Sequence, residues 1–531
     1  MKRAPVFATA ALVASAVAAS AAGASQPKPI NKPFVTDSVQ VTADPSAVRA
    51  HTSPQIARSP RTGELVIVEG DLRGTRACNV FVSTNDGRSW SPGGEPLRAP
   101  FTDCAFKADW GPYATMAFDR DGVLYMAIEA SDPKVFVENR PDVPRHLFLA
   151  RSTDSGRTFQ TSTVYTAPAG NPDKGINKGA TVAVDQKDPR NVYVGWRQGN
   201  FGAPTVQEKL KTNVAASTDG GRTWGAPVEV SDSRGGDFPW LAVTPDGILH
   251  VVTWTRVWPV PPTGQLNPVR ELFHVSSSDH GKTFAPRTTI DPGNQQHEHP
   301  PVIASDPRTG ALYVAWSAQP DANNQVAGYQ APLNVYFRSS ADGGKTWSDK
   351  LTLNDNLPGT ANAIDPGISV APNGRIDVGW YDSRQNPKPL AQRTETGLND
   401  VYATFSVDGG RTFVANIRVS DRSADRSIGV WANNIDQRLD VGVASSDDSA
   451  YFVWSDTRNN NPNFQPEDIY MASVKLYGDE PIALGRGDKG TPAWLVLGAG
   501  LAFGMGVAMV GAFFVFRSSS RRPAPMEAAR G

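Results

Sequence analysis

The sequence has little cysteine, almost no net charge and, between its two ends, no segment with a long helical period. Two cysteines among 531 residues exclude a disulfide-rich scaffold and a zinc site made of four cysteines. The 52 Lys and Arg residues nearly cancel the 53 Asp and Glu residues, which excludes a globally basic protein that binds nucleic acid through phosphates. A charged fraction of 20% also argues against a disordered, charged chain.

Turn-forming residues are abundant instead. The chain has 48 glycines and 43 prolines, an excess over average usage that favours many short strands joined by turns. A length of 531 residues indicates either about three domains or one large repeat architecture.

The two ends of the chain carry the features of export and anchoring. Basic residues at positions 2 and 3 precede an uncharged, alanine-rich stretch and a small-x-small site, so we expect a signal peptide over residues 1–24. Residues 493–516 are 24 residues without a charge, long enough to cross a membrane, and arginines follow at once. We therefore expect a single-pass protein of the cell membrane with residues 25–477 outside, a Gly- and Pro-rich stalk over 478–492 and a cytoplasmic tail over 517–531.

A short segment recurs six times in the middle of the chain, at intervals of 60 to 69 residues. The six copies are STNDGRSW (83–90), STDSGRTF (152–159), STDGGRTW (217–224), SSDHGKTF (277–284), SADGGKTW (340–347) and SVDGGRTF (406–413). A fixed period of this length indicates a repeat architecture. The pattern resembles the Asp box, or BNR repeat, of the sialidase (neuraminidase) superfamily.

Each position of this segment has a structural purpose. The aspartate can accept backbone N–H groups within a turn, the glycine permits the positive φ of that turn, and the aromatic residue can pack between neighbouring sheets. We therefore interpret the segment as a turn device without catalytic residues.

Strand pairs separate these segments. Seven copies of a strand, a tight turn and a second strand recur, and six of them lead through a third strand into the repeated segment. Each unit thus predicts a four-stranded propeller blade. We expect an all-β, seven-bladed β-propeller, with a six-bladed ring and an extra hairpin as the alternative. The last unit lacks a fourth strand, and residues 38–42 are predicted to supply it and close the ring.

The long loops of such a propeller fall on the face opposite the repeated turns. Variable loops on a repeat scaffold are where binding sites usually lie. Cys78 and Cys104 fall on this face, and an exported chain with only these two cysteines is expected to join them in a disulfide.

The resemblance to sialidases implies a catalytic set on the loop face. Enzymes of that family bind a substrate carboxylate with three arginines and use a tyrosine, a glutamate and an aspartate in the reaction. An arginine fork suits a carboxylate well. The residues that match by type and place are Arg197, Arg256, Arg384 and Arg458 for the carboxylate clamp, with Tyr381, Asp382, Glu298 and Asp365 for the chemistry.

A structural interpretation of two of these arginines stands beside the catalytic one. The pattern W-x-D-x-R occurs twice, at 380–384 and 454–458, and a repeated ion pair of this kind can imitate an active site. His297 and His299 flank Glu298, but no third ligand is evident, so we expect no metal and no cofactor.

Two hypotheses follow from the sequence. The first is a sialidase-like glycoside hydrolase that acts on anionic glycans outside the cell. The second is a non-catalytic propeller that binds a glycan or a surface protein through its loop face. Fold alone does not decide between them.

Overall fold

The computed structural model describes residues 33–43, 45–73, 77–101, 104, 114–131, 145–167, 177–198, 208–255, 257–258, 271–292, 300–320, 333–357, 360–387, 397–429, 441–459 and 466–476. These residues belong to the first of two compact units, residues 1–482, whereas residues 483–531 form the second. The signal peptide, stalk, membrane helix and tail predicted from the sequence lie outside the described residues. No helix within those ranges is long and apolar enough to cross a membrane.

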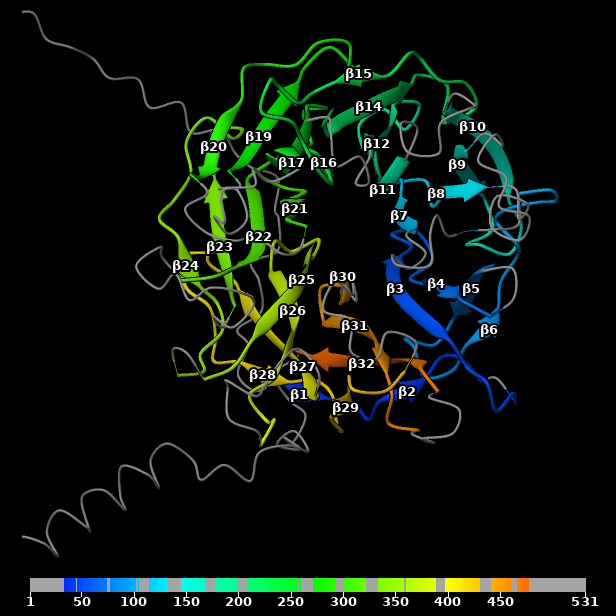
Figure 1. Ribbon diagram of the computed structural model, residues 1–531, viewed down its shortest axis with the longest axis vertical. Coiled ribbons are helices and arrows are strands. Elements are labelled where there is room, and N and C mark those ends of the chain that lie inside the picture. The colour runs from blue at the N-terminus through cyan, green and yellow to red at the C-terminus, as the bar shows by residue number, and fades with distance from the viewer. Residues whose placement is uncertain are drawn as a thin grey trace, which may run out of the picture. The chain divides into compact units, whose positions relative to one another are not determined.

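The described chain is an all-β, seven-bladed propeller, as the sequence predicts (Figure 1). Seven antiparallel sheets stand around a common axis, and the first strand of each sheet lies nearest that axis. The short strands follow from the many turn residues and from the valine and aromatic residues between them.

The strands of the first four blades follow the chain in order. Blade 1 contains β3 (His51–Arg58), β4 (Leu65–Asp71), β5 (Ala77–Ser83) and β6 (Ser91–Pro92). Blade 2 contains β7 (Ala114–Phe118), β8 (Leu124–Ser131), β9 (Arg145–Ser152) and β10 (Gln160–Thr166). Blade 3 contains β11 (Asn177–Val184), β12 (Val192–Gln198), β14 (Lys211–Ser217) and β15 (Val228–Glu229). Blade 4 contains β16 (Trp240–Val243), β17 (Leu249–Trp254), β19 (Leu272–Ser277) and β20 (Thr288–Asp291).

The last three blades complete the ring. Blade 5 contains β21 (Val302–Ser305), β22 (Leu312–Ala318), β23 (Asn334–Ser340) and β24 (Leu351–Thr352). Blade 6 contains β25 (Ala363–Val370), β26 (Ile376–Asp382), β27 (Leu398–Ser406) and β28 (Ile417–Arg418), with β29 (Ala424–Asp425) paired to β27. Blade 7 contains β30 (Gly442–Ser445), β31 (Ser449–Asp456) and β32 (Asp468–Lys475).

The N-terminal segment closes the seventh blade. β2 (Val39–Gln40) pairs antiparallel with β32, with Val39 opposite Met471, and β1 (Phe34–Val35) extends the same edge. The strand predicted over residues 38–42 therefore pairs where it was expected. This pairing covers an edge of β32 that would otherwise be open to other chains.

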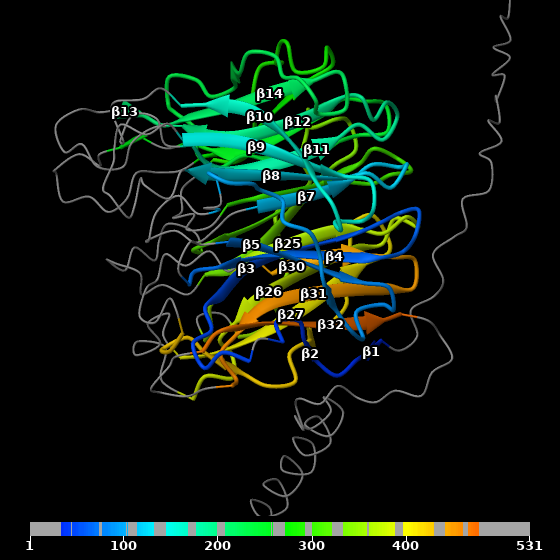
Figure 2. The same ribbon diagram turned by 90° about the vertical axis from the view of Figure 1, so that its right-hand side faces the viewer.

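A smaller two-stranded ribbon stands apart from the blades. It joins β13 (Glu208–Lys209) to β18 (Val257–Trp258), which belong to the connections between the second and third strands of blades 3 and 4. Figure 2 shows β13 on the opposite side of the propeller from the end of β32, and hence on the loop face.

The six repeated turns have the predicted hydrogen bonds. In the second copy, the Thr158 N–H donates to Asp154 Oδ1 over 2.8 Å and the Thr158 hydroxyl donates to Asp154 Oδ2 over 2.7 Å. Gly156 has φ +84° and its N–H donates to Ser152 Oγ over 2.8 Å. Asn85 replaces the aspartate in the first copy, and its Oδ1 still accepts the N–H of Ser89 over 3.0 Å.

The core consists of seven hydrophobic clusters among the described residues, one at each interface between neighbouring blades. The aromatic residues of the repeated turns pack against the preceding blade, as Phe413 does against Phe337 with ring centroids 4.9 Å apart. The ring is thus held together by burial between blades rather than by one central core.

Candidate functional site

Within the described ranges, a cation stacked on an aromatic ring joins consecutive blades at four places. In each, the cation lies over an aromatic residue of the third strand of its own blade and pairs with an aspartate at or after the fourth strand of the preceding blade. The four sets are Arg287, Phe273 and Asp232; Lys350, Tyr336 and Asp291; Arg384, Tyr402 and Asp355; and Arg458, Tyr470 and Asp421. We call each set an inter-blade clasp.

The two W-x-D-x-R segments build the clasps of blades 6 and 7. The Arg384 guanidinium donates to both oxygens of Asp382, over 3.0 and 2.8 Å, and to Asp355 over 2.6 Å. The indole of Trp380 donates to Asp382 over 3.1 Å. Burial opposes the charge of Arg384, but the bonds to Asp382 and Asp355 outweigh it and raise the arginine's pKa.

Arg458 repeats this arrangement one blade later. It donates to Asp456 over 2.7 Å and to Asp421 over 2.5 Å, and its guanidinium lies 4.2 Å from the centre of the Tyr470 ring. The structural interpretation of the repeated segment accounts for both arginines. As a carboxylate clamp they stay a prediction, because a ligand would have to displace Asp355 or Asp421.

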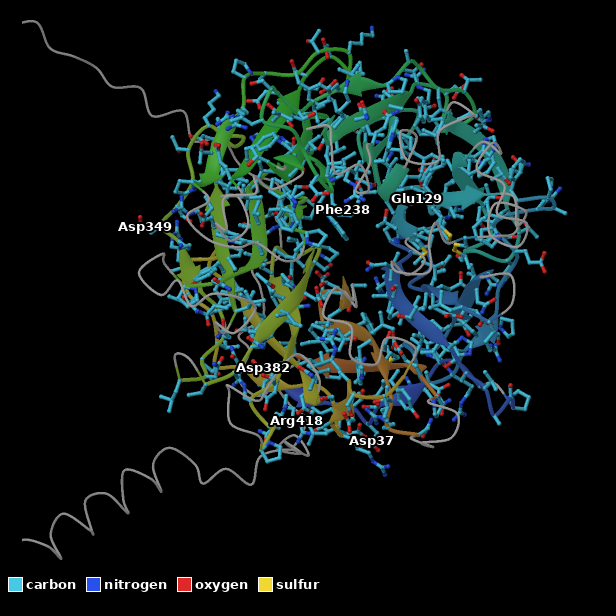
Figure 3. All side chains as sticks on the ribbon, in the orientation of Figure 1. Asp37, Glu129, Phe238, Asp349, Asp382 and Arg418 are labelled. Carbon is cyan, nitrogen blue, oxygen red and sulfur yellow. A yellow bond between two sulfur atoms is a disulfide. The ribbon has the colours of Figure 1, made fainter. Side chains whose placement is uncertain are left out.

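Arg197 lies in a different sector of the ring. It is fully buried near the end of β12 and donates to Asp237 over 2.9 Å, with its guanidinium 4.2 Å from the centre of the Phe238 ring. Figure 3 labels Phe238 and Asp382 in different parts of the ring, so Arg197 is not brought together with Arg384.

Two predicted site residues, Arg256 and Glu298, lie outside the described residues. Among the residues that the structure does describe, no group of three His, Cys, Asp or Glu side chains could hold a metal ion. Cys78 and Cys104 form the predicted disulfide, with their Cα atoms 5.4 Å apart.

Tyr381 occupies the loop-face end of β26, between blades 6 and 7. Its hydroxyl accepts the N–H of Ser455 over 3.0 Å and donates to the Ser455 carbonyl over 3.4 Å. Burial raises the pKa of Tyr381 well above its usual value, the charge of Arg426 opposes this rise, and the carboxylates of Glu467 and Asp365 add to it. The charges of these three groups therefore influence the ionisation of Tyr381.

These four residues form a compact set, which we call the Tyr381 cluster: Asp365, Tyr381, Arg426 and Glu467. Their exposed fractions are 0 to 7%, and the Arg426 guanidinium lies 5.6 Å from the centre of the Tyr381 ring. Charged and phenolic groups buried together in this way are a feature of functional sites as well as of structural networks.

The backbone at two positions shapes the cluster. Asp365 has φ +55° and lies in a bulge of β25, opposite the end of β26 that carries Tyr381. Aspartate is among the few residues that tolerate this conformation. A side chain on Gly429, which has φ +98°, would come within 2.8 Å of Glu467 Oε2, so the segment after β29 lies directly on the Glu467 carboxylate.

Sequence reasoning identified Tyr381 and Asp365 but missed Arg426 and Glu467. Both missed residues stand outside the repeated patterns, just after β29 and just before β32. Only the packing of blade 7 against blades 6 and 1 brings them to Tyr381, and no spacing in the sequence carries that information.

No protein-family model matches the chain, and no curated protein matches it. Solved structures do resemble it. A protein of unknown function from Dyadobacter fermentans is 13% identical, with 84% of this chain and 100% of that chain covered and a TM-score of 0.44.

Glycosidases are also among the similar structures. The Penicillium chrysogenum alpha-L-arabinanase complexed with arabinobiose is 13% identical, with 65% of this chain and 94% of that chain covered and a TM-score of 0.43. The phage phi92 endosialidase is 12% identical, with 86% and 72% covered and a TM-score of 0.42. At these identities and TM-scores, the similarity leaves the activity of the chain open.

Proposed function

We propose that the chain is a surface-anchored propeller of the glycoside hydrolase type that acts on anionic glycans outside the cell. The observation that carries the proposal is the Tyr381 cluster, in which a phenol, two carboxylates and a guanidinium are buried together at the loop face. Glycoside hydrolysis needs two carboxyl groups beside the scissile bond, and some sialidases use a tyrosine as the nucleophile.

The residues of the cluster divide into roles by their chemistry. The Tyr381 oxygen attacks the anomeric carbon while the bond to the leaving group breaks, and Glu467 accepts the phenolic proton. Asp365, as an acid, gives a proton to the departing oxygen and then, as a base, takes one from the water that releases the sugar from Tyr381, while Glu467 returns its proton to the Tyr381 oxygen. Arg426 supplies the positive charge that an anionic glycan requires.

The raised pKa of Tyr381 is consistent with these roles. A phenol whose pKa lies well above the usual value is neutral at physiological pH and attacks only if a base removes its proton during the reaction. The N–H of Ser455, which already donates to the Tyr381 oxygen over 3.0 Å, stabilises the negative charge that develops there.

Steady-state hydrolysis of a fluorogenic sialoside by the purified protein tests the proposal. We expect turnover by the wild type and its loss, by at least 100-fold in kcat, in Tyr381→Phe, because the nucleophile is removed. Arg287→Lys is the matched control, since it keeps a cation in a clasp outside the cluster. Turnover that survives in Tyr381→Phe contradicts the assignment.

A non-catalytic propeller that binds a glycan or a surface protein is the second candidate. The observation that favours it is the pairing of Arg197, Arg384 and Arg458 with carboxylates of the chain itself. This candidate is supported if the wild type binds a sialoside but hydrolyses neither it nor other anionic glycosides.

A further inference from the structure

A buried histidine and glutamate lie side by side at the loop-face end of blade 1. His51 begins β3, and Glu69 lies near the end of β4. Asn79 lies opposite Glu69 on β5. His51 Nδ1 is 3.1 Å from Glu69 Oε1, and the Asn79 amide donates to the same oxygen over 2.7 Å. His51 and Glu69 form what we call the His51 dyad.

The second oxygen of Glu69 differs from the first. Glu69 Oε2 is buried and has no hydrogen-bond donor among the residues that the structure describes. Leaving a buried acceptor unsatisfied is energetically costly, and such groups in native proteins require an explanation. Burial raises the pKa of Glu69, and the bond to His51 only partly opposes this rise.

A carboxylate two residues further on provides the contrast. Asp71 lies on the same strand, and both of its oxygens accept bonds from Arg73, over 2.9 and 2.6 Å. Arg73 thus pairs with the partly buried Asp71, whereas no described residue donates to the second oxygen of the fully buried Glu69. Two carboxylates on the same strand thus differ in whether both of their oxygens are bonded.

The dyad adjoins the Tyr381 cluster across the closure of the ring. The His51 N–H donates to the Glu467 carbonyl over 3.1 Å, and the Glu467 N–H donates to the Arg49 carbonyl over 3.2 Å. Glu467 of the Tyr381 cluster and His51 of the dyad are thus joined directly through their backbones.

We propose that the His51 dyad is a second subsite for the ligand of the Tyr381 cluster, in which Glu69 Oε2 accepts a hydrogen bond from a hydroxyl or amide N–H of a glycan. Polyhydroxylated ligands fit because they present many such donors. Asn79 and His51 hold the Glu69 carboxyl in place through Oε1 and leave Oε2 for the ligand. The inference rests on the proposed function for the identity of the ligand.

Binding of the fluorogenic sialoside to the Tyr381→Phe protein, measured by isothermal titration calorimetry, tests the inference without turnover. We expect Glu69→Gln to weaken binding at least tenfold, because the amide puts a donor where the ligand needs an acceptor. Asp71→Asn is the control and is expected to change the dissociation constant less than twofold. Equal binding with and without Glu69→Gln overturns the inference.

The outcomes separate the inference from the proposed function. Binding that depends on Glu69, together with a wild type that does not turn over the sialoside, retains the subsite and refutes the hydrolase. Turnover by the wild type, together with binding that Glu69→Gln does not change, retains the hydrolase and refutes the subsite. The absence of any binding refutes both. If Glu69→Gln fails to fold, a crystal structure of the Tyr381→Phe protein with the sialoside decides: a ligand donor within 3.5 Å of Glu69 Oε2 is expected, and a ligand bound away from it contradicts the proposal.

Discussion

Acid is expected to destabilise this propeller through two buried histidines of blade 4. His250 Nδ1 and His274 Nε2 are 2.9 Å apart, and threonine hydroxyls at the outer ring nitrogens extend the chain of hydrogen bonds. Burial lowers the pKa of His250 to about 4, and burial together with the neighbouring His250 lowers that of His274 to about 3. Both rings are therefore neutral in the folded protein at pH 7.

The sign and size of the effect follow from these pKa values. In the unfolded chain, both histidines bind a proton below about pH 6.5. In the folded protein, they stay neutral until the pH falls to about 4. The unfolded state thus binds more protons in this window, and the free energy of unfolding falls as pH falls, by about 1.4 kcal/mol per pH unit for each histidine. Between pH 7 and 4.5 the loss is about 2–3 kcal/mol from each.

Urea unfolding followed by tryptophan fluorescence at pH 7, 6, 5 and 4.5 measures this loss. The double variant His250→Gln, His274→Gln is the reference, because its carboxylates titrate as in the wild type and cancel in the difference. We expect the wild type to lose several kcal/mol more than the variant over this range. Equal pH dependence in the two proteins would refute the reasoning.

Three further predictions concern the scaffold. Arg384→Ala is expected to lower the free energy of unfolding by about 3–5 kcal/mol, because it leaves Asp382 fully buried without its counter-charge, and chemical denaturation checks this. Ser217→Ala removes the acceptor of the Gly221 N–H in the third repeated turn and should lower the free energy of unfolding by about 1–3 kcal/mol in the same assay. An unchanged free energy of unfolding would contradict a structural role for the turn. Deletion of residues 33–41 uncovers the edge of β32, and size-exclusion chromatography should then show aggregation, while a stable monomer would contradict closure by this segment.

The repeated turns and the closure of the ring could be predicted because their causes are local. Each turn needs its aspartate, glycine and aromatic residue at fixed positions, so its copies stand out in the sequence at a regular interval. The strand before the first unit was recognisable because the last unit lacked one.

The clasps and the Tyr381 cluster could be predicted only in part, because their contacts cross between blades. The cations of the clasps occupy different places in their blades. Lys350 lies just before a fourth strand, whereas Arg384 lies in the loop after a second strand. No common spacing in the sequence therefore reveals the four clasps. Arg426 and Glu467 meet Tyr381 through irregular segments whose course is decided by packing and not by a period.

Covalent labelling of Tyr381 tests the central claim most directly. A fluorinated sialoside with fluoride as its leaving group should leave the sugar on the nucleophile, because a fluorine beside the anomeric carbon slows the second step. Mass spectrometry of peptides from the labelled protein is then expected to place the sugar on Tyr381, and no adduct should form in Tyr381→Phe. A label on another residue, or none in a protein that turns over the unmodified sialoside, would contradict the account.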